Sequence, residues 1–168
     1  MKAKIIVGGL AVLLLVLLAI PRLFPDEPAL IRKAFREVVR LVEKNEPLNP
    51  LQIAARLNQL EDFIAEDVDI RLGRNLPDLK GWSQLQRYAA LALQHAIAIR
   101  IRIHGTELTP QPGQAWSMHA VLEVRADTRG MWESGFTELE IIWTRRGSDW
   151  VIQSARTLSS IAHPADSF

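Results

Sequence analysis

The spacing of apolar residues changes along the chain from a helical to a strand period. From residue 27 to residue 44, apolar side chains return every three or four positions and charged side chains fill most of the gaps. This period is typical of a helix with one buried face. Asp26 or Glu27 can cap the helix, with Pro28 in its first turn, and the helix is predicted to end before Asn45. Its predicted apolar face consists of Leu30, Ile31, Ala34, Phe35, Val38, Val39 and Val42.

Two more helices and one short strand are predicted before residue 97. Asn49, Pro50 and Gln52 stand at the spacing of a capping box, with proline as the first helical residue. The buried stripe of this second helix consists of Ile53, Leu57, Leu60 and Ile64. A short strand is predicted where polar residues alternate with Val68, Ile70 and Leu72. The third helix follows Gly81, and its apolar positions are Leu85, Tyr88, Ala89, Ala92 and Ala96.

Alternation of apolar and polar residues from residue 99 onward predicts a sheet with one buried face. The apolar positions are Ile99, Ile101, Ile103, Trp116, Met118, Ala120, Leu122, Val124, Leu139, Ile141 and Trp143. The opposite face carries Arg100, Arg102, His104, His119, Glu123, Arg125, Glu138 and Glu140. A loop with Pro110, Pro112 and Gly113 separates the first two long strands, and the last strand is predicted to start at Trp150. The sequence therefore predicts an α+β domain, with three helices packed on a mainly antiparallel sheet.

A separate apolar segment stands at the start of the chain. Residues 5–20 form a run of sixteen residues without a polar or charged side chain, equivalent to about 24 Å of helix. Snorkelling by Lys2 and Lys4 can bring this length to the thickness of a bilayer. We therefore predict a signal-anchor transmembrane helix over residues 1–24, followed by a single domain over residues 25–168.

Basic residues predict the orientation of this anchor. Lys2, Lys4 and the terminal amine outweigh Arg22, so the N-terminus is predicted to stay in the cytoplasm and the domain to lie outside it. The predicted location is the cell membrane, with a single span. Secretion after cleavage of a signal peptide is the alternative, although no pair of small residues at cleavage spacing precedes Pro21.

Composition excludes several classes of function. The 168 residues include no cysteine, which excludes disulfides, thiol nucleophiles and thiolate metal sites. After residue 24, 17 basic side chains stand against 19 acidic ones, and a weakly acidic domain without a basic run is a poor partner for nucleic acid. A zinc set of His104, His119 and Glu123 would be flanked by arginines that repel a cation. No metal is predicted, and without a glycine-rich phosphate loop no cofactor is predicted either.

The order of the predicted elements carries information of its own. A helix pair is followed by the strand Glu66-Asp67-Val68-Asp69-Ile70, a helix led by Gly81, three long strands and the closing Asp149-Trp150-Val151-Ile152. This order resembles the nuclear transport factor 2-like (SnoaL-like) superfamily, over roughly residues 27–160. The resemblance implies a curved sheet wrapped around the helices in a cone-shaped, cystatin-like cup, often with a pocket inside. The superfamily includes isomerases, dehydratases and polyketide cyclases as well as non-catalytic binding and scaffold domains.

Enzymes of the resembled superfamily commonly place an acid or a base inside the cone. The predicted inner face of the sheet holds no Asp, Glu or His, so no catalytic residue is predicted on it. His95, near the end of the third helix, is the one candidate that could reach the interior, and a partly exposed histidine at a helix end is the alternative. An apolar pocket would be lined by Tyr88, Trp116, Met118 and Trp143, whereas ordinary core packing is the other interpretation of these side chains.

Three hypotheses about function follow. The first, which we favour, is a non-catalytic domain tethered to the membrane by residues 5–20, which binds an envelope protein or forms a homodimer. The second is a cup that binds a small apolar ligand, and the third is an isomerase- or dehydratase-like enzyme that uses His95. A tightly packed interior would favour the first, an open apolar cavity without an ionisable group the second, and a buried His95 the third.

Overall fold

A computed structural model describes residues 26–73, 77–128 and 130–163 of the chain. The helices and strands are α2 (Glu27–Val42), α3 (Pro50–Glu61), β1 (Ile64–Arg71), β2 (Leu79–Lys80), α4 (Trp82–His95), β3 (Ala98–Gln111), β4 (Ala115–Thr128), β5 (Met131–Arg146) and β6 (Asp149–His163). Among the described residues no helix is long and apolar enough to cross a membrane. The anchor predicted over residues 1–24 lies outside the described residues.

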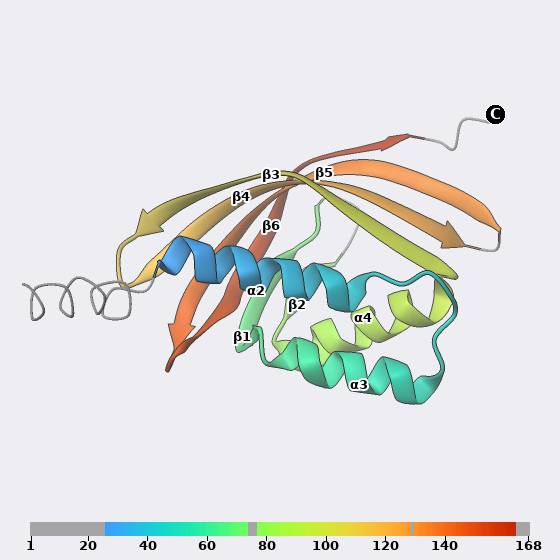
Figure 1. Cartoon of the computed structure of the whole chain (residues 1–168), viewed down its shortest axis with the longest axis horizontal. Coiled ribbons are helices and arrows are strands. Elements are labelled where there is room, and N and C mark those ends of the chain that lie inside the picture. The colour runs from blue at the N-terminus through green and yellow to red at the C-terminus, as the bar shows by residue number, and fades with distance from the viewer. Residues whose placement is uncertain (1–25, 74–76, 129, 164–168) are drawn as a thin grey trace, which may run out of the picture.

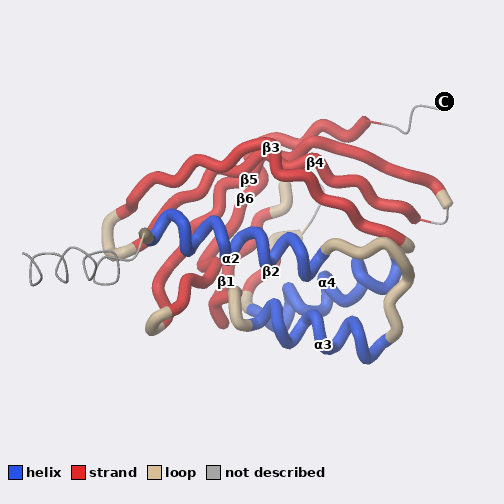
Figure 2. The backbone as a smooth tube through the Cα atoms, viewed as in Figure 1, coloured by secondary structure: helices blue, strands red, loops and turns tan. Residues whose placement is uncertain are grey.

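The strands form one curved sheet with all three helices on its concave side (Figures 1 and 2). The strand order is β2-β1-β6-β5-β4-β3. β1 runs parallel to β6, and every other neighbouring pair is antiparallel. The predicted α+β class with three helices on a mainly antiparallel sheet is confirmed, and the parallel pair makes the sheet mixed.

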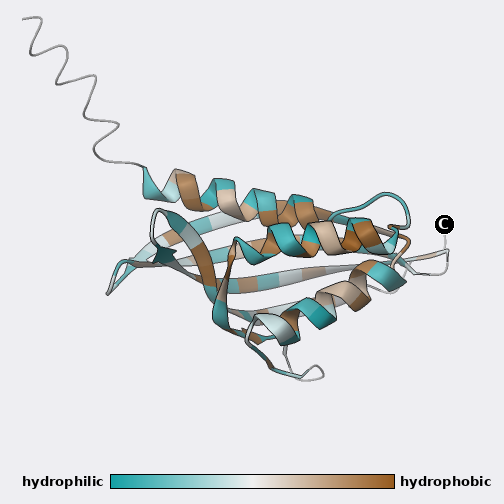
Figure 3. Ribbon diagram, turned by 90° about the horizontal axis from the view of Figure 1, so that it is seen from below, coloured by the Kyte–Doolittle hydropathy of each residue, from teal (hydrophilic) through white to brown (hydrophobic). Residues whose placement is uncertain are grey.

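α2 packs on the sheet as predicted, but Leu30 of its predicted apolar face is 42% exposed. The Asp26 carboxylate accepts a hydrogen bond from the Ala29 N–H at 3.2 Å and caps the helix. Ile31, Phe35 and Val39 are buried in the main core. Leu41, on another side of the helix, is buried in a second cluster beside α3 and α4. Apolar and polar stretches lie side by side around the helices (Figure 3), as expected for amphipathic elements.

α3 and α4 differ in part from the sequence prediction. The capping box of Asn49 and Gln52 is present, but Ile64 begins β1 instead of ending α3. Ile64 continues the helical spacing of Leu57 and Leu60, so periodicity alone does not reveal the change to a strand. α4 follows Gly81, whose φ of 77° favours glycine.

The buried face of α4 is rotated from the predicted one. Leu93 is buried, whereas Tyr88 is 44% exposed and Ala92 is also exposed. The physical reason is composition: alanines lie around much of this helix, and a methyl group indicates a buried face only weakly. The predicted apolar side of α4 is therefore wrong at Tyr88 and Ala92.

The long strands extend further than predicted. β3 continues to Gln111, so Pro110 belongs to the strand and the turn contains only Pro112, Gly113 and Gln114. A proline is tolerated there because β3 is an edge strand. The register shifts between Ile103 and Gly105. β2 has two residues, too few for alternation to be visible in the sequence.

Candidate functional site

A cavity of about 260 Å³ lies between the helices and the concave face of the sheet. α2, α3 and α4 form one side of it, and β1, β3, β4, β5 and β6 form the other. Apart from Arg71, Arg156 and Thr157, every described residue that lines it is apolar. We call this space the inner cavity, and its walls include Phe35, Val39, Leu85, Ala89, Leu122 and Ile141.

Small side chains help to keep the inner cavity open. Ala89 is the wall residue of α4 that follows Trp82 and Leu85 at helical spacing, and Ala155 is a wall residue of β6. A larger apolar residue at either position would reach further into the interior. The cavity thus depends on two methyl-sized side chains among larger ones.

Two arginines contribute to the edge of the cavity, but their charged groups are bonded elsewhere. Arg71 donates from Nη2 to Asp69 Oδ2 at 2.9 Å, and this hydrogen bond is the main reason that the pKa of Arg71 is raised. Arg156 donates from Nε to Glu140 Oε2 at 2.5 Å. Both guanidinium groups lie on the outer side of the sheet, because they alternate along the strands with the inward residues Ile70 and Ala155. The inner cavity therefore lies opposite these charges.

Of the four residues predicted to line a pocket, Trp116, Met118 and Trp143 lie together on β4 and β5, and Tyr88 lies apart from them. Trp116 and Trp143 are register partners on β4 and β5, and Met118 is two residues from Trp116. Met118 and Trp143 are fully buried in the main core. Trp116 donates from Nε1 to Glu27 Oε2 at 3.1 Å in the first turn of α2. Tyr88 is on the exposed side of α4, and none of the four is among the described residues that line the inner cavity.

His95, His104 and His119 also lie away from the cavity. His95 is the last residue of α4, and it is exposed. His104 lies 3.1 Å from Glu123 on the outer face, whereas His119 pairs in register with Glu107 and Glu140. His104 and His119 are not cross-strand partners. Within the described part of the chain, no three His, Asp or Glu residues are grouped so that they could hold a metal ion.

The residues that form the cavity wall were predicted only as core. Phe35, Val38 and Val39 carry the same apolar signal whether they pack tightly or border a space. The sequence pattern does not give the volume between the helices and the sheet, because this volume depends on how α4 faces the sheet. Ala89 and Ala155 are the residues that could have suggested a gap, and alanine is too common for that inference.

Comparisons with known proteins show the fold. No family model matches the chain, and no curated protein matches its sequence. Two structures of LinA, one of them named a hexachlorocyclohexane dehydrochlorinase, superpose with TM-scores of 0.70 and 0.67 at 10% identity, covering 89% of this chain and 95% of theirs. The fold is nuclear transport factor 2-like.

Two further structures agree with this assignment. A protein described as a candidate scytalone dehydratase from Novosphingobium aromaticivorans has a TM-score of 0.66 at 8% identity, covering 84% of this chain and 95% of its own. A nuclear transport factor 2-like protein from Salmonella enterica has a TM-score of 0.63 at 12% identity, covering 82% and 91%. The resemblance seen in the sequence is confirmed at the level of fold. Identities this low carry no activity from one protein to another.

Proposed function

We propose that the domain binds a small apolar molecule in the inner cavity. The observation that carries the proposal is a cavity of about 260 Å³ whose described walls are apolar except at Arg71, Arg156 and Thr157. Apolar walls of this kind are usual in small-molecule sites. Of the three hypotheses drawn from the sequence, this is the second, the apolar-ligand cup.

The volume indicates the size of the ligand. An apolar cavity of about 150 Å³ holds benzene, with six carbon atoms. By proportion, the inner cavity of about 260 Å³ has room for roughly ten carbon atoms. A monocyclic or bicyclic hydrocarbon fits this size, whereas a steroid-sized molecule does not.

The described walls favour binding without proton transfer. They hold no carboxylate, imidazole or amine, and the guanidinium groups of Arg71 and Arg156 are engaged by Asp69 and Glu140. General acid or base catalysis needs a titratable group within hydrogen-bond reach of the reacting atom. The enzymes among the structural neighbours therefore support the cup shape, and a dehydratase-like activity has less support here.

The tether remains a prediction. Residues 5–20 lie outside the described part of the chain, so the membrane location and an envelope partner stay as predicted from the sequence. A ligand-binding cup is compatible with such a tether, and tests of the inner cavity do not depend on it.

The test is a titration of the purified full chain with benzene, naphthalene and pyrene. A ligand that binds only the folded state raises the melting temperature, and the stabilisation grows with the logarithm of the ratio of free ligand to its dissociation constant. We expect naphthalene to bind saturably and raise the melting temperature, and pyrene, with sixteen carbon atoms, to have no effect. Absence of saturable binding by both benzene and naphthalene would refute the proposal.

Matched variants on α4 locate the binding. Ala89→Leu places three more carbon atoms in the cavity, and a ligand that competes for this space loses about 1–3 kcal/mol, roughly tenfold or more in affinity. Ala92→Leu, three residues further on the exposed side of the same helix, is the control and should leave the affinity unchanged. Equal losses in both variants would show that naphthalene binds elsewhere.

A further inference from the structure

A second cavity, of about 430 Å³, lies where α2 ends, α3 begins and β3 starts. It is lined by residues from these three elements and from the loop between α2 and α3, none of which lines the inner cavity among the described residues. We call it the junction pocket. Its charged residues are Arg40, Glu43, Lys44, Glu46, Arg56 and Arg100.

The junction pocket has more basic than acidic groups near it, although the chain after residue 24 has more acidic than basic residues. Arg40 is paired with Glu37 on α2 at 2.7 Å. In the described part of the chain, no carboxylate lies within ion-pair distance of Lys44, Arg56 or Arg100. Three cationic side chains therefore line one pocket without an acidic partner.

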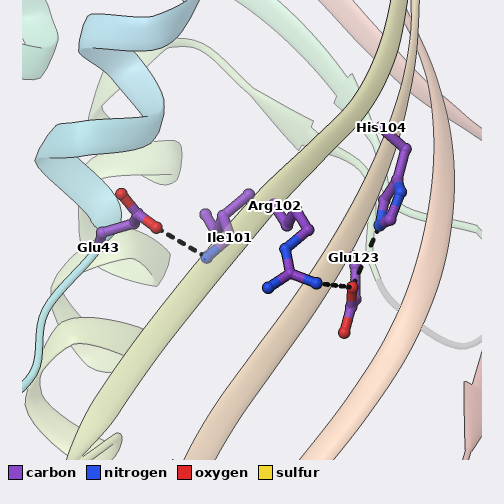
Figure 4. A network of polar contacts seen from close by, with 5 residues as sticks. All are labelled: Glu43, Ile101, Arg102, His104 and Glu123. Carbon is purple, nitrogen blue, oxygen red and sulfur yellow. Dashed lines mark hydrogen bonds and ion pairs between the residues drawn. The ribbon is translucent and has the colours of Figure 1, made fainter.

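The carboxylate of Glu43 is engaged with the sheet. Its Oε1 accepts a hydrogen bond from the Ile101 N–H at 2.9 Å, and Figure 4 shows the group directed at the edge of β3. Glu46 is exposed in the loop. Neither group neutralises Lys44 or Arg56 at short range, and the exposed Arg100 has its Cζ 5.2 Å from the centroid of the Trp132 ring.

Hydrogen bonds hold Lys44 and Arg56 in place, and each side chain keeps N–H groups without a partner among the described residues. Lys44 is 4% exposed, and its Nζ donates to the Leu93 carbonyl oxygen at 2.5 Å, which uses one of its three N–H groups. Arg56 donates from Nη1 to the carbonyl oxygens of Leu41, at 3.0 Å, and Glu43. Its Nε and Nη2 have no partner among the described residues. Fixed donors of this kind recognise an oxyanion at low entropic cost.

We propose that the junction pocket binds the phosphate group of a small anion. A buried cation without a counter-charge is costly, and a dianion beside Lys44 and Arg56 removes this cost. The planar guanidinium fork fits the oxygen atoms of phosphate, and an ammonium adds a point charge. This site is independent of the inner cavity and of its proposed ligand.

The experiment titrates the full chain with inorganic phosphate at low ionic strength, measured by calorimetry. We expect saturable binding of one phosphate per chain. Arg100→Gln removes an exposed arginine of the pocket and should weaken binding about tenfold, the value of one hydrogen bond between charged groups. Arg102→Gln is the control: it lies two residues further on β3, and its guanidinium faces Glu123 at 3.7 Å (Figure 4).

Three outcomes overturn the proposal: absence of saturable phosphate binding, an equal loss in Arg100→Gln and Arg102→Gln, or a Lys44 side chain whose NMR signals do not respond to phosphate. The last measurement needs no variant, because a bound dianion must raise the pKa of the nearby amine. Naphthalene binding by Arg100→Gln should equal that of the wild type, which separates this site from the inner cavity.

Two further probes identify the source of the phosphate. Binding of glycerol 3-phosphate as tight as that of inorganic phosphate supports a soluble ligand. Binding of vesicles that contain phosphatidic acid, but not of phosphatidylcholine vesicles, supports a lipid headgroup. Both kinds of binding depend on the same contacts, so Arg100→Gln should lower the affinity in each case.

Discussion

Lys44 carries its amine into the interior between the end of α2 and the last turn of α4. Its backbone also bridges to β3, with Lys44 N donating to Ile99 O at 2.9 Å and Ile99 N donating to Lys44 O at 2.8 Å. Burial, and then the charge of Arg56, lower the pKa of Lys44 from its ordinary value of 10.5. A single residue thus joins a helix, a second helix and the edge of the sheet.

Because the pKa of Lys44 is lowered, the free energy of unfolding depends on pH in the alkaline range. Between the folded-state pKa of Lys44 and 10.5, the unfolded chain binds more protons than the folded one. The free energy of unfolding therefore rises with pH through this window. We expect Lys44→Met to lack that rise in urea unfolding from pH 7 to pH 10.5, and Lys33→Met, on the exposed side of α2, to retain it. If the free energy of unfolding changed with pH in the same way in Lys44→Met and in the wild type, this assignment would be wrong.

Sequence patterns did not reveal this role of Lys44. A lysine at the end of an amphipathic helix, next to Asn45, looks like a solvated residue. Its burial results from contacts with Leu93 of α4 and Ile99 of β3, which come more than 45 residues later in the chain. The junction pocket has the same origin, because Arg56 and Arg100 come from separate elements. Local periodicity carries no information about contacts between residues that lie so far apart in the sequence.

Among the helices, α3 has the clearest local signal and a small buried face. Its capping box is complete, with the Asn49 side chain accepting from the Gln52 N–H at 2.9 Å and the Gln52 side chain accepting from the Asn49 N–H at 2.9 Å. Only Leu57 and Leu60 are buried along it. The start of this helix was therefore predictable to the residue, because caps are read from neighbouring positions alone.

We expect Asn49→Ala to lower the free energy of unfolding by about 1 kcal/mol, since it leaves the Gln52 N–H of α3 without its acceptor. Asn58→Ala, on the exposed side of the same helix, is the matched control and should be neutral. Chemical denaturation of both variants checks this. A loss in Asn58→Ala as large as that in Asn49→Ala would show that the cap has no special effect.

Elements whose ends depend on partners were predicted less well. Pro110 ends a strand in most contexts, but on the outer edge of β3 it leaves the ladder to β4 intact. Ile64 fits a helix and a strand equally, and its pairing with Ile152 of β6 decides the outcome. The parallel contact of β1 with β6 has no local signal at all.

Across the whole molecule, two hydrophobic clusters stabilise different parts of the fold. The main cluster lies under β4, β5 and β6 and contains fully buried Met118 and Trp143. The second cluster joins α3 and α4 to the start of β3. The general architecture was predictable because alternation identified the inner face of the sheet. The inner cavity was not, because its size depends on the distance between layers.

This division predicts an order of local opening. Amides of β4 around Met118 and Ala120 should exchange with solvent only through global unfolding, whereas those of α3 should exchange through a smaller opening. Native-state hydrogen exchange at increasing urea concentration measures both. Protection of α3 equal to that of β4 would mean that the two clusters open as one unit.

The central position of β6 has a consequence for synthesis. Residues 149–163 lie between β1 and β5, yet they are the last of the described strands to leave the ribosome. Until they emerge, β1 and β5 each lack β6, the strand that pairs with both of them. The apolar side chains of both strands stay uncovered during this interval, a condition that recruits chaperones. A chain stalled before residue 149 therefore lacks the strand that joins β1 to β5.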